Sequence, residues 1–219
     1  MRRSILLIII IFFFSCNKQN KEGDFLLMKG DILFQDLDSS PLCEAIENVT
    51  PGFNNMNFSH VGIVSIIDGT PMVYEAYPPS VQLIDLKVFL NRSLDINNKP
   101  KVIVGRLKKE YRKSIRSAIS FIENKVGTKY DEFFLYENNQ FYCSELLYDA
   151  FLKDSIFELR PMNYKYQDSN EFQKQWINHF KKLDFEIPQG KLGINPGTMS
   201  ISEKIEIVQI FGEVSKKSN

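Results

Sequence analysis

A β-hairpin predicted over residues 60–77 is the feature of this sequence that most constrains the fold. Two runs rich in β-branched and aromatic residues are separated by an Asp-Gly dipeptide at positions 68–69, which is typical of two-residue hairpin turns. With such a turn, Gly62 on the first strand lies opposite Glu75 on the second. His60 precedes Gly62 by two residues and shares its face, so His60 and Glu75 are predicted to be diagonal neighbours. A three-residue turn without a bulge would instead separate their faces.

A predicted helix begins at Cys143. Apolar residues follow it at helical spacing, namely Leu146, Leu147, Ala150 and Phe151. A thiol in the first turn of a helix lies near the positive end of the helix dipole, which favours the nucleophilic thiolate. The alternative is that Cys143 packs as a small apolar side chain, as most free cysteines do.

These residues together predict a catalytic triad. A cysteine nucleophile needs a base and a third group that orients the base, and His60 and Glu75 can fill those roles. We expect the start of the Cys143 helix to pack against the sheet face that carries them, and its backbone N–H to help bind an oxyanion. Taken alone, His60 also fits a structural histidine, and Glu75 an exposed carboxylate.

The N-terminus predicts export. Two arginines precede an unbroken apolar run over residues 5–14, which is too short to span a bilayer and has the form of a signal-peptide core. Ser15 and Cys16 follow at once and resemble the processing site of bacterial lipoproteins, on which Cys16 becomes the lipidated first residue of the mature chain. The alternatives are a plain secretory signal or a short anchor.

Charge and cysteine content exclude several functions. Without residues 1–15 the chain has 25 basic and 27 acidic residues. It has no basic stripe with interleaved aromatic residues, so a nucleic-acid partner is not predicted. Cys43 and Cys143 then remain in an oxidising compartment, where they either form a disulfide or leave a thiol for catalysis. The sequence has two histidines far apart and no CxxC motif, so it predicts no metal site. It also lacks a Gly-rich phosphate loop, so it predicts no nucleotide cofactor.

The remaining chain predicts one domain over residues 25–215, joined to the lipid by a polar tether over residues 16–24. Residues 35–58 read as a long surface loop with one short helix near 42–47, which we expect on the substrate side of the molecule. The other predicted elements are strands at 25–34, 81–86 and 102–107, helices at 108–125 and 168–183, and a final short strand or helix at 205–211.

Five motifs, in this order, resemble the YiiX-like family. They are Gly30-Asp31-Ile32-Leu33-Phe34, Ser59-His60-Val61-Gly62-Ile63-Val64, Val73-Tyr74-Glu75-Ala76, Tyr130-Asp131 with Phe134, and Tyr142-Cys143-Ser144-Glu145-Leu146. That family comprises circularly permuted relatives of the NlpC-type papain-like cysteine peptidases and amidases. The resemblance implies an α+β fold in which an antiparallel sheet or small barrel packs against the catalytic-cysteine helix. It also implies Cys143 as nucleophile, His60 as base, Glu75 as its polar partner, and Tyr130 and Ser144 as substrate contacts.

The function expected on these grounds is that of a lipid-anchored cysteine hydrolase in the bacterial cell envelope. Its substrate would be an amide bond in cell-wall peptide or in a small N-acyl amino compound. One alternative is a lipid acyltransferase or thioesterase on the same core, although such enzymes tend to carry a second histidine where Glu75 stands. The other is a binding lipoprotein with an inactive site.

Overall fold

The computed structural model describes residues 25–217 except 51 and 137, so the predicted signal peptide, Cys16 and the tether lie outside the described residues. A six-stranded sheet with the order β4-β3-β2-β1-β5-β8 organises the domain, and every neighbouring pair is antiparallel. Its strands are β1 (Ile32–Gln35), β2 (His60–Ile67), β3 (Thr70–Tyr77), β4 (Ser80–Asp85), β5 (Val102–Leu107) and β8 (Ile205–Ile210). A separate two-stranded ribbon consists of β6 (Arg160–Pro161) and β7 (Leu192–Gly193).

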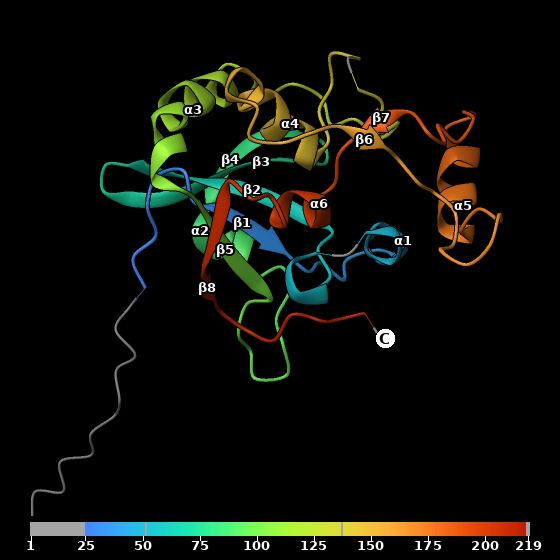
Figure 1. The fold of residues 1–219 in the computed structure, drawn as a ribbon, viewed down its shortest axis with the longest axis horizontal. Helices are drawn as coiled ribbons and strands as arrows, with labels where there is room; N and C mark the ends of the chain where they lie inside the picture. Colours follow the sequence, from blue (N-terminus) through green and yellow to red (C-terminus); the bar gives the residue numbers. More distant parts are fainter. Residues whose placement is uncertain (1–24, 51, 137, 218–219) are drawn as a thin grey trace, which may run out of the picture.

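Helices cover the sheet and extend beyond one end of it. They are α1 (Pro41–Val49), α2 (Leu86–Leu90), α3 (Ile115–Glu123), α4 (Cys143–Ala150), α5 (Lys174–Lys182) and α6 (Pro196–Ser200), with short 3-10 segments at Phe53–Asn55, Lys109–Ser114 and Leu152–Asp154. α3 and α4 lie side by side over the sheet, whereas α1 and α5 contact each other at the far end (Figure 1). In the part of the chain that the structure describes, no helix has the length and apolarity needed to cross a bilayer.

The hairpin prediction is confirmed. Ile67 lies opposite Thr70 across a two-residue turn in which Asp68 and Gly69 both have positive φ, 50° and 78°. This is the conformation in which a tight hairpin turn matches the twist of its strands. The register continues to the pair Ile63 and Tyr74, so the next position places Gly62 opposite Glu75 as predicted.

The two faces of the sheet have separate cores. Val61, Ile63 and Tyr74 share one core with Leu146 and Leu147 of α4. The alternate residues Leu33, Val64 and Val73 share the other core with Phe89 of α2. Successive side chains of a strand point to opposite faces, so α4 and α2 each pack against different side chains of the same strands.

The expectation that the start of α4 packs against the sheet face carrying His60 and Glu75 is therefore wrong in one respect, because the apolar side of α4 packs on the opposite face. His60 is in register with Gln35, lies two positions from Gly62, and packs against Phe89 on the α2 face. The physical reason is strand alternation: the apolar face of α4 pairs with the odd-numbered side chains of β2, which leaves the even-numbered ones to α2.

Several predicted boundaries also shift. The helix expected at 108–125 is a 3-10 segment followed by α3, which ends at Glu123 rather than near Gly127. The helix expected at 168–183 begins only at Lys174, because Gln173 is extended and its buried side chain donates to the Ala45 carbonyl at 3.1 Å. The short helix expected near 42–47 is confirmed as α1, and the segment at 205–211 is a strand, β8.

Candidate active site

His60 and Glu75 form a buried pair at the end of the sheet. Nε2 of His60 lies 2.7 Å from Oε2 of Glu75, and the Glu75 side chain is fully buried. His60 is the first residue of β2, and Glu75 lies near the end of β3. The diagonal contact predicted from the hairpin register is thus present, with hydrogen-bonding geometry.

Glu75 has two further partners that the sequence did not indicate. Arg92 donates two hydrogen bonds to its carboxylate, at 2.6 Å to Oε2 and 2.5 Å to Oε1, and Gln82 donates a third at 2.8 Å. A bidentate guanidinium is the geometry that best compensates a buried carboxylate. Arg92 also stacks over the Tyr77 ring at 4.1 Å, which fixes the plane of the guanidinium.

The imidazole is held by aromatic rings as well as by Glu75. The ring of His60 lies 5.5 Å from the rings of Tyr77 and of Phe89, with an edge-to-face arrangement to Tyr77. A Cβ at Gly62 would come within 2.9 Å of Phe89, so the absence of a side chain there lets that ring approach the strand. The histidine is therefore fixed in position by packing and hydrogen bonding together.

Cys143 is the first residue of α4, and its side chain lies close enough to the imidazole of His60 to raise the pKa of that ring. Since Nε2 of His60 is occupied by Glu75, Nδ1 is the ring nitrogen left for the thiol. The two residues meet although their elements occupy different faces, because His60 begins its strand at the sheet end and Cys143 begins its helix. Cys143, His60 and Glu75 form one connected chain of contacts.

Electrostatics favour a charged histidine in this chain. Burial opposes the charged imidazole, but the nearby Cys143 and the hydrogen bond that His60 donates to Glu75 outweigh burial and raise the pKa of His60 to about 9. Burial likewise opposes the Glu75 carboxylate, yet its bonds to His60 and Arg92 lower the pKa of Glu75 to about 2. At neutral pH the site thus contains an imidazolium between a carboxylate and the sulfur.

The start of α4 is fixed by its own side chains. The backbone N–H of Tyr142 donates to Oε2 of Glu145 at 3.4 Å, which is half of a capping box. The amides of a first helical turn have no partner within the helix, and that of Cys143 is one of them. An anion next to the sulfur can therefore be stabilised by this N–H and by the helix dipole.

The two predicted substrate contacts lie at one cavity with Cys143. Tyr130 is half-buried, and burial first, then the nearby Cys143, raises the pKa of its hydroxyl well above the usual value, so the hydroxyl stays neutral. The buried Ser144 hydroxyl donates to the Ile194 carbonyl at 2.9 Å. This contact ties α4 to the segment after β7, and the contact of either residue with substrate stays a prediction.

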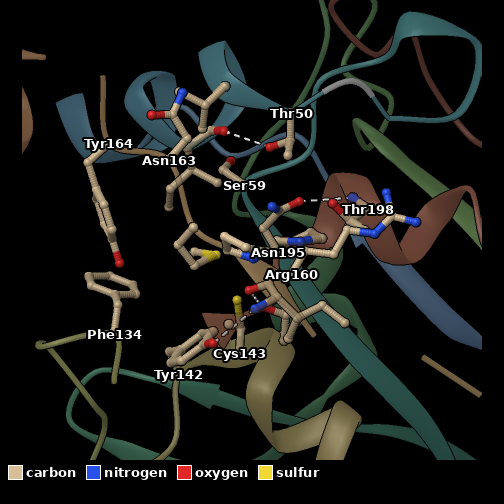
Figure 2. Close-up of a pocket in the computed structure, with 18 of the residues that line it drawn as sticks. Thr50, Ser59, Phe134, Tyr142, Cys143, Arg160, Asn163, Tyr164, Asn195 and Thr198 are labelled. Atoms are coloured by element: carbon tan, nitrogen blue, oxygen red, sulfur yellow. Dashed lines mark hydrogen bonds between the residues drawn. The ribbon is translucent and has the colours of Figure 1, made fainter. Parts of the chain in front are cut away.

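The cavity in front of Cys143 has a volume of about 200 Å³ (Figure 2). Phe134 and Tyr164 form one side, Arg160, Asn195 and Thr198 lie on the opposite side, and the Cys143 side chain points toward the middle. Ile46, Val49 and Thr50 of the 35–58 segment also line it, so the expected position of that segment beside the site is confirmed. Cys43 of the same segment and Cys143 are both free thiols, and they form no disulfide.

Comparison with known proteins agrees with this geometry. A family model described as "permuted papain-like amidase enzyme, YaeF/YiiX, C92 family" matches residues 26–209. The chain belongs to this family. Its permuted papain-like α+β fold is also that of a crystal structure of metalloprotein yiiX from Escherichia coli O157:H7, with a TM-score of 0.68 and 20% identity over 84% of this chain and 98% of that one. None of the curated proteins searched matches the sequence.

YiiX is described as a metalloprotein, which raises the question of a metal site in this chain. Among the residues that the structure describes, no group of three or more His, Cys, Asp or Glu side chains is arranged to hold a metal ion. Both carboxylate oxygens of Glu75 are already bound by Arg92 and its other partners. The donor set around Cys143 therefore does not fit a metal.

Proposed function

We propose that this protein is a cysteine amidase that cleaves an amide bond in cell-wall peptide or in a small N-acyl amino compound. The observation that carries the proposal is the position of the imidazole, which has Glu75 at 2.7 Å from one nitrogen and the Cys143 side chain beside the ring. This is the arrangement in which a base holds a nucleophile ready and is itself oriented by a third group.

The first half of the reaction follows from the placement of these groups. The Cys143 thiolate attacks the carbonyl carbon and forms a C–S bond, and the oxyanion accepts a hydrogen bond from the first turn of α4. As the C–N bond breaks, the imidazolium of His60 gives its proton to the departing amine. The products of this half are the free amine and an acyl-thioester on Cys143.

The second half restores the enzyme. His60, now neutral, takes a proton from a water molecule, whose oxygen attacks the thioester carbon. The C–S bond breaks, the carboxylic acid leaves, and the thiolate–imidazolium pair is formed again. Glu75 and Arg92 stay charged throughout, because their task is to orient the imidazole and to stabilise its positive form.

Replacement of the nucleophile tests this proposal. The full chain in detergent is incubated with muropeptides, with N-acyl amino acids and with phospholipid, and products are identified by mass spectrometry. We expect Cys143→Ala to abolish amide cleavage with an unchanged thermal midpoint, and Cys43→Ala to retain it. Amide cleavage that persists in Cys143→Ala would refute the mechanism, and products from phospholipid alone would favour acyl transfer instead.

We also propose that the mature chain is anchored in the bacterial cell envelope through a lipid on Cys16. The sequence motif supports this, since the apolar run at 5–14 ends directly before Ser15-Cys16. Expression with a labelled fatty acid should label the chain, and Cys16→Ala should remove the label and release the protein from membranes. A Cys16→Ala chain that keeps both label and membrane association would contradict the anchor.

A further inference from the structure

The cavity beside Cys143 has features that select among the substrates of the proposed amidase. Its walls are mainly apolar and include Ile46, Val49, Phe134, Trp176 and Ile194. A mostly apolar cavity with a few polar groups near the reacting atom is typical of small-molecule sites. We propose, on the basis of the amidase function above, that this cavity binds an apolar acyl group of the substrate.

The position of His60 decides which half of the substrate occupies the cavity. Cys143 lines the cavity, whereas His60 is not among its lining residues and lies buried beside the sulfur. The leaving amine must lie next to His60, because it takes its proton from that ring. The acyl group is the part of the substrate that remains on the sulfur, and Cys143, unlike His60, lines the cavity.

The volume limits the size of that acyl group. A cavity of roughly 150 Å³ lined by aliphatic and aromatic side chains accommodates benzene, a ring of six carbons. At about 200 Å³, this cavity has room by proportion for roughly eight carbons, either as a chain or as a substituted aromatic ring. A long fatty-acyl chain is too large to be enclosed, and a cationic peptide side chain would be desolvated against apolar walls that carry Arg160.

Aromatic side chains make one wall of the cavity rigid. Tyr164 and Trp176 both line it, and their rings pack edge to face with centroids 4.9 Å apart. Both residues belong to the buried core, so this wall is held by packing and offers an apolar surface to the acyl group.

Anilides that share one leaving amine provide the test. The full chain is assayed with acetyl, hexanoyl, octanoyl and dodecanoyl 4-nitroanilide. We expect kcat/KM to rise roughly fourfold per added methylene up to about eight carbons and then to level off. N-octylacetamide, in which the long chain is on the amine, should be cleaved no faster than N-methylacetamide.

Two substitutions locate this effect in the cavity. Ile201 lines the cavity and is 46% exposed, whereas Ile177 on α5 is 44% exposed and does not line it. Ile201→Trp should reduce the octanoyl-to-acetyl ratio of kcat/KM at least fivefold, and Ile177→Trp should leave the ratio unchanged. Both positions are exposed, so neither substitution is expected to disturb folding.

A labelling experiment separates failure of the cavity proposal from failure of the amidase proposal. Hexyl and methyl methanethiosulfonate are compared for their rates of modifying Cys143, with Cys43 as the internal control. We expect hexyl to modify Cys143 at least tenfold faster than methyl, and the preference to be lost in Ile201→Trp. If anilides resist cleavage but this preference is found, the acyl site stands without the amidase. If Cys143-dependent cleavage is insensitive to chain length, or a long amine is preferred, the acyl site is refuted while the amidase stands.

Discussion

Arg92 is the residue whose removal tests the electrostatic design of this site most directly. Its two hydrogen bonds reach a carboxylate with no solvent exposure, while the Arg92 side chain itself is 15% exposed. A hydrogen bond to a charged group contributes about 1.5–3 kcal/mol, and breaking a buried pair by removing one partner costs about 3–5 kcal/mol. We therefore expect Arg92→Met to lower the free energy of unfolding by about 3–5 kcal/mol.

Urea unfolding measures this loss. The single tryptophan, Trp176, is buried on α5 and reports unfolding by fluorescence. The matched control is Arg112→Met, which removes a partner of Glu206 from a surface pair whose side chains are 41% and 48% exposed. Such exposed pairs contribute less than about 1 kcal/mol. The denaturant slope must stay constant among the variants for the comparison to hold.

A double-mutant cycle identifies the cause of the loss. If Arg92 acts by compensating the Glu75 charge, Arg92→Met should cost at least about 2 kcal/mol less in a Glu75→Gln background than in the wild type. Equal costs in both backgrounds would show that Arg92 stabilises through packing on Tyr77 instead. A loss for Arg92→Met no greater than that for Arg112→Met would refute the argument that Glu75 depends on this partner.

Three further predictions concern pH and packing. With the pKa of His60 at about 9, kcat/KM should fall as pH rises through 9, and Glu75→Gln should move this fall to lower pH, because a partner that raises the pKa is removed; an unmoved fall would assign it to another group. Burial raises the pKa of Glu47 to about 7, so the stability that its protonated carboxyl contributes is complete below pH 4.5 and is lost as pH rises through 7. The free energy of unfolding of Glu47→Gln should therefore rise relative to that of the wild type by up to about 3 kcal/mol between pH 5 and pH 8. The substitution Glu44→Gln, at an exposed position of the same helix, should show no such rise. Gly62→Ala should lower the free energy of unfolding by about 1–3 kcal/mol and should lower activity, because its Cβ would meet Val73 at 2.6 Å and displace Phe89 beside His60. Thermal melts and assays that match the wild type would contradict this.

The part of the site that the sequence predicted is the part determined by local geometry. The turn at residues 68–69 sets the register of the hairpin, and the register alone makes His60 and Glu75 neighbours. The helix that starts at Cys143 was likewise readable from apolar spacing within one short segment. In both cases a few consecutive residues contain all the necessary information.

What the sequence did not predict depends on contacts between distant segments. Strand alternation showed that His60 and Glu75 share a face, but periodicity cannot say which face a helix some 70 residues later will cover. The cavity is similar, since its walls come partly from α1 and from residues 160–201, neither of which carries a motif for it. Only the packed core brings these segments together.

Arg92 lies between these two cases, and one physical argument could have pointed to it. Once Glu75 is placed beside His60 on a covered sheet face, its carboxylate is removed from water, and a buried carboxylate needs more compensation than a single imidazole supplies. The chain must then bring a cation to that face, and the residues next to α2, which covers the face, are the ones placed to do so. Arg92 follows β4 and α2 directly, so it is the first arginine after the hairpin that can reach Glu75. The need to balance the charge of a buried acid can therefore indicate a functional residue that no sequence motif identifies.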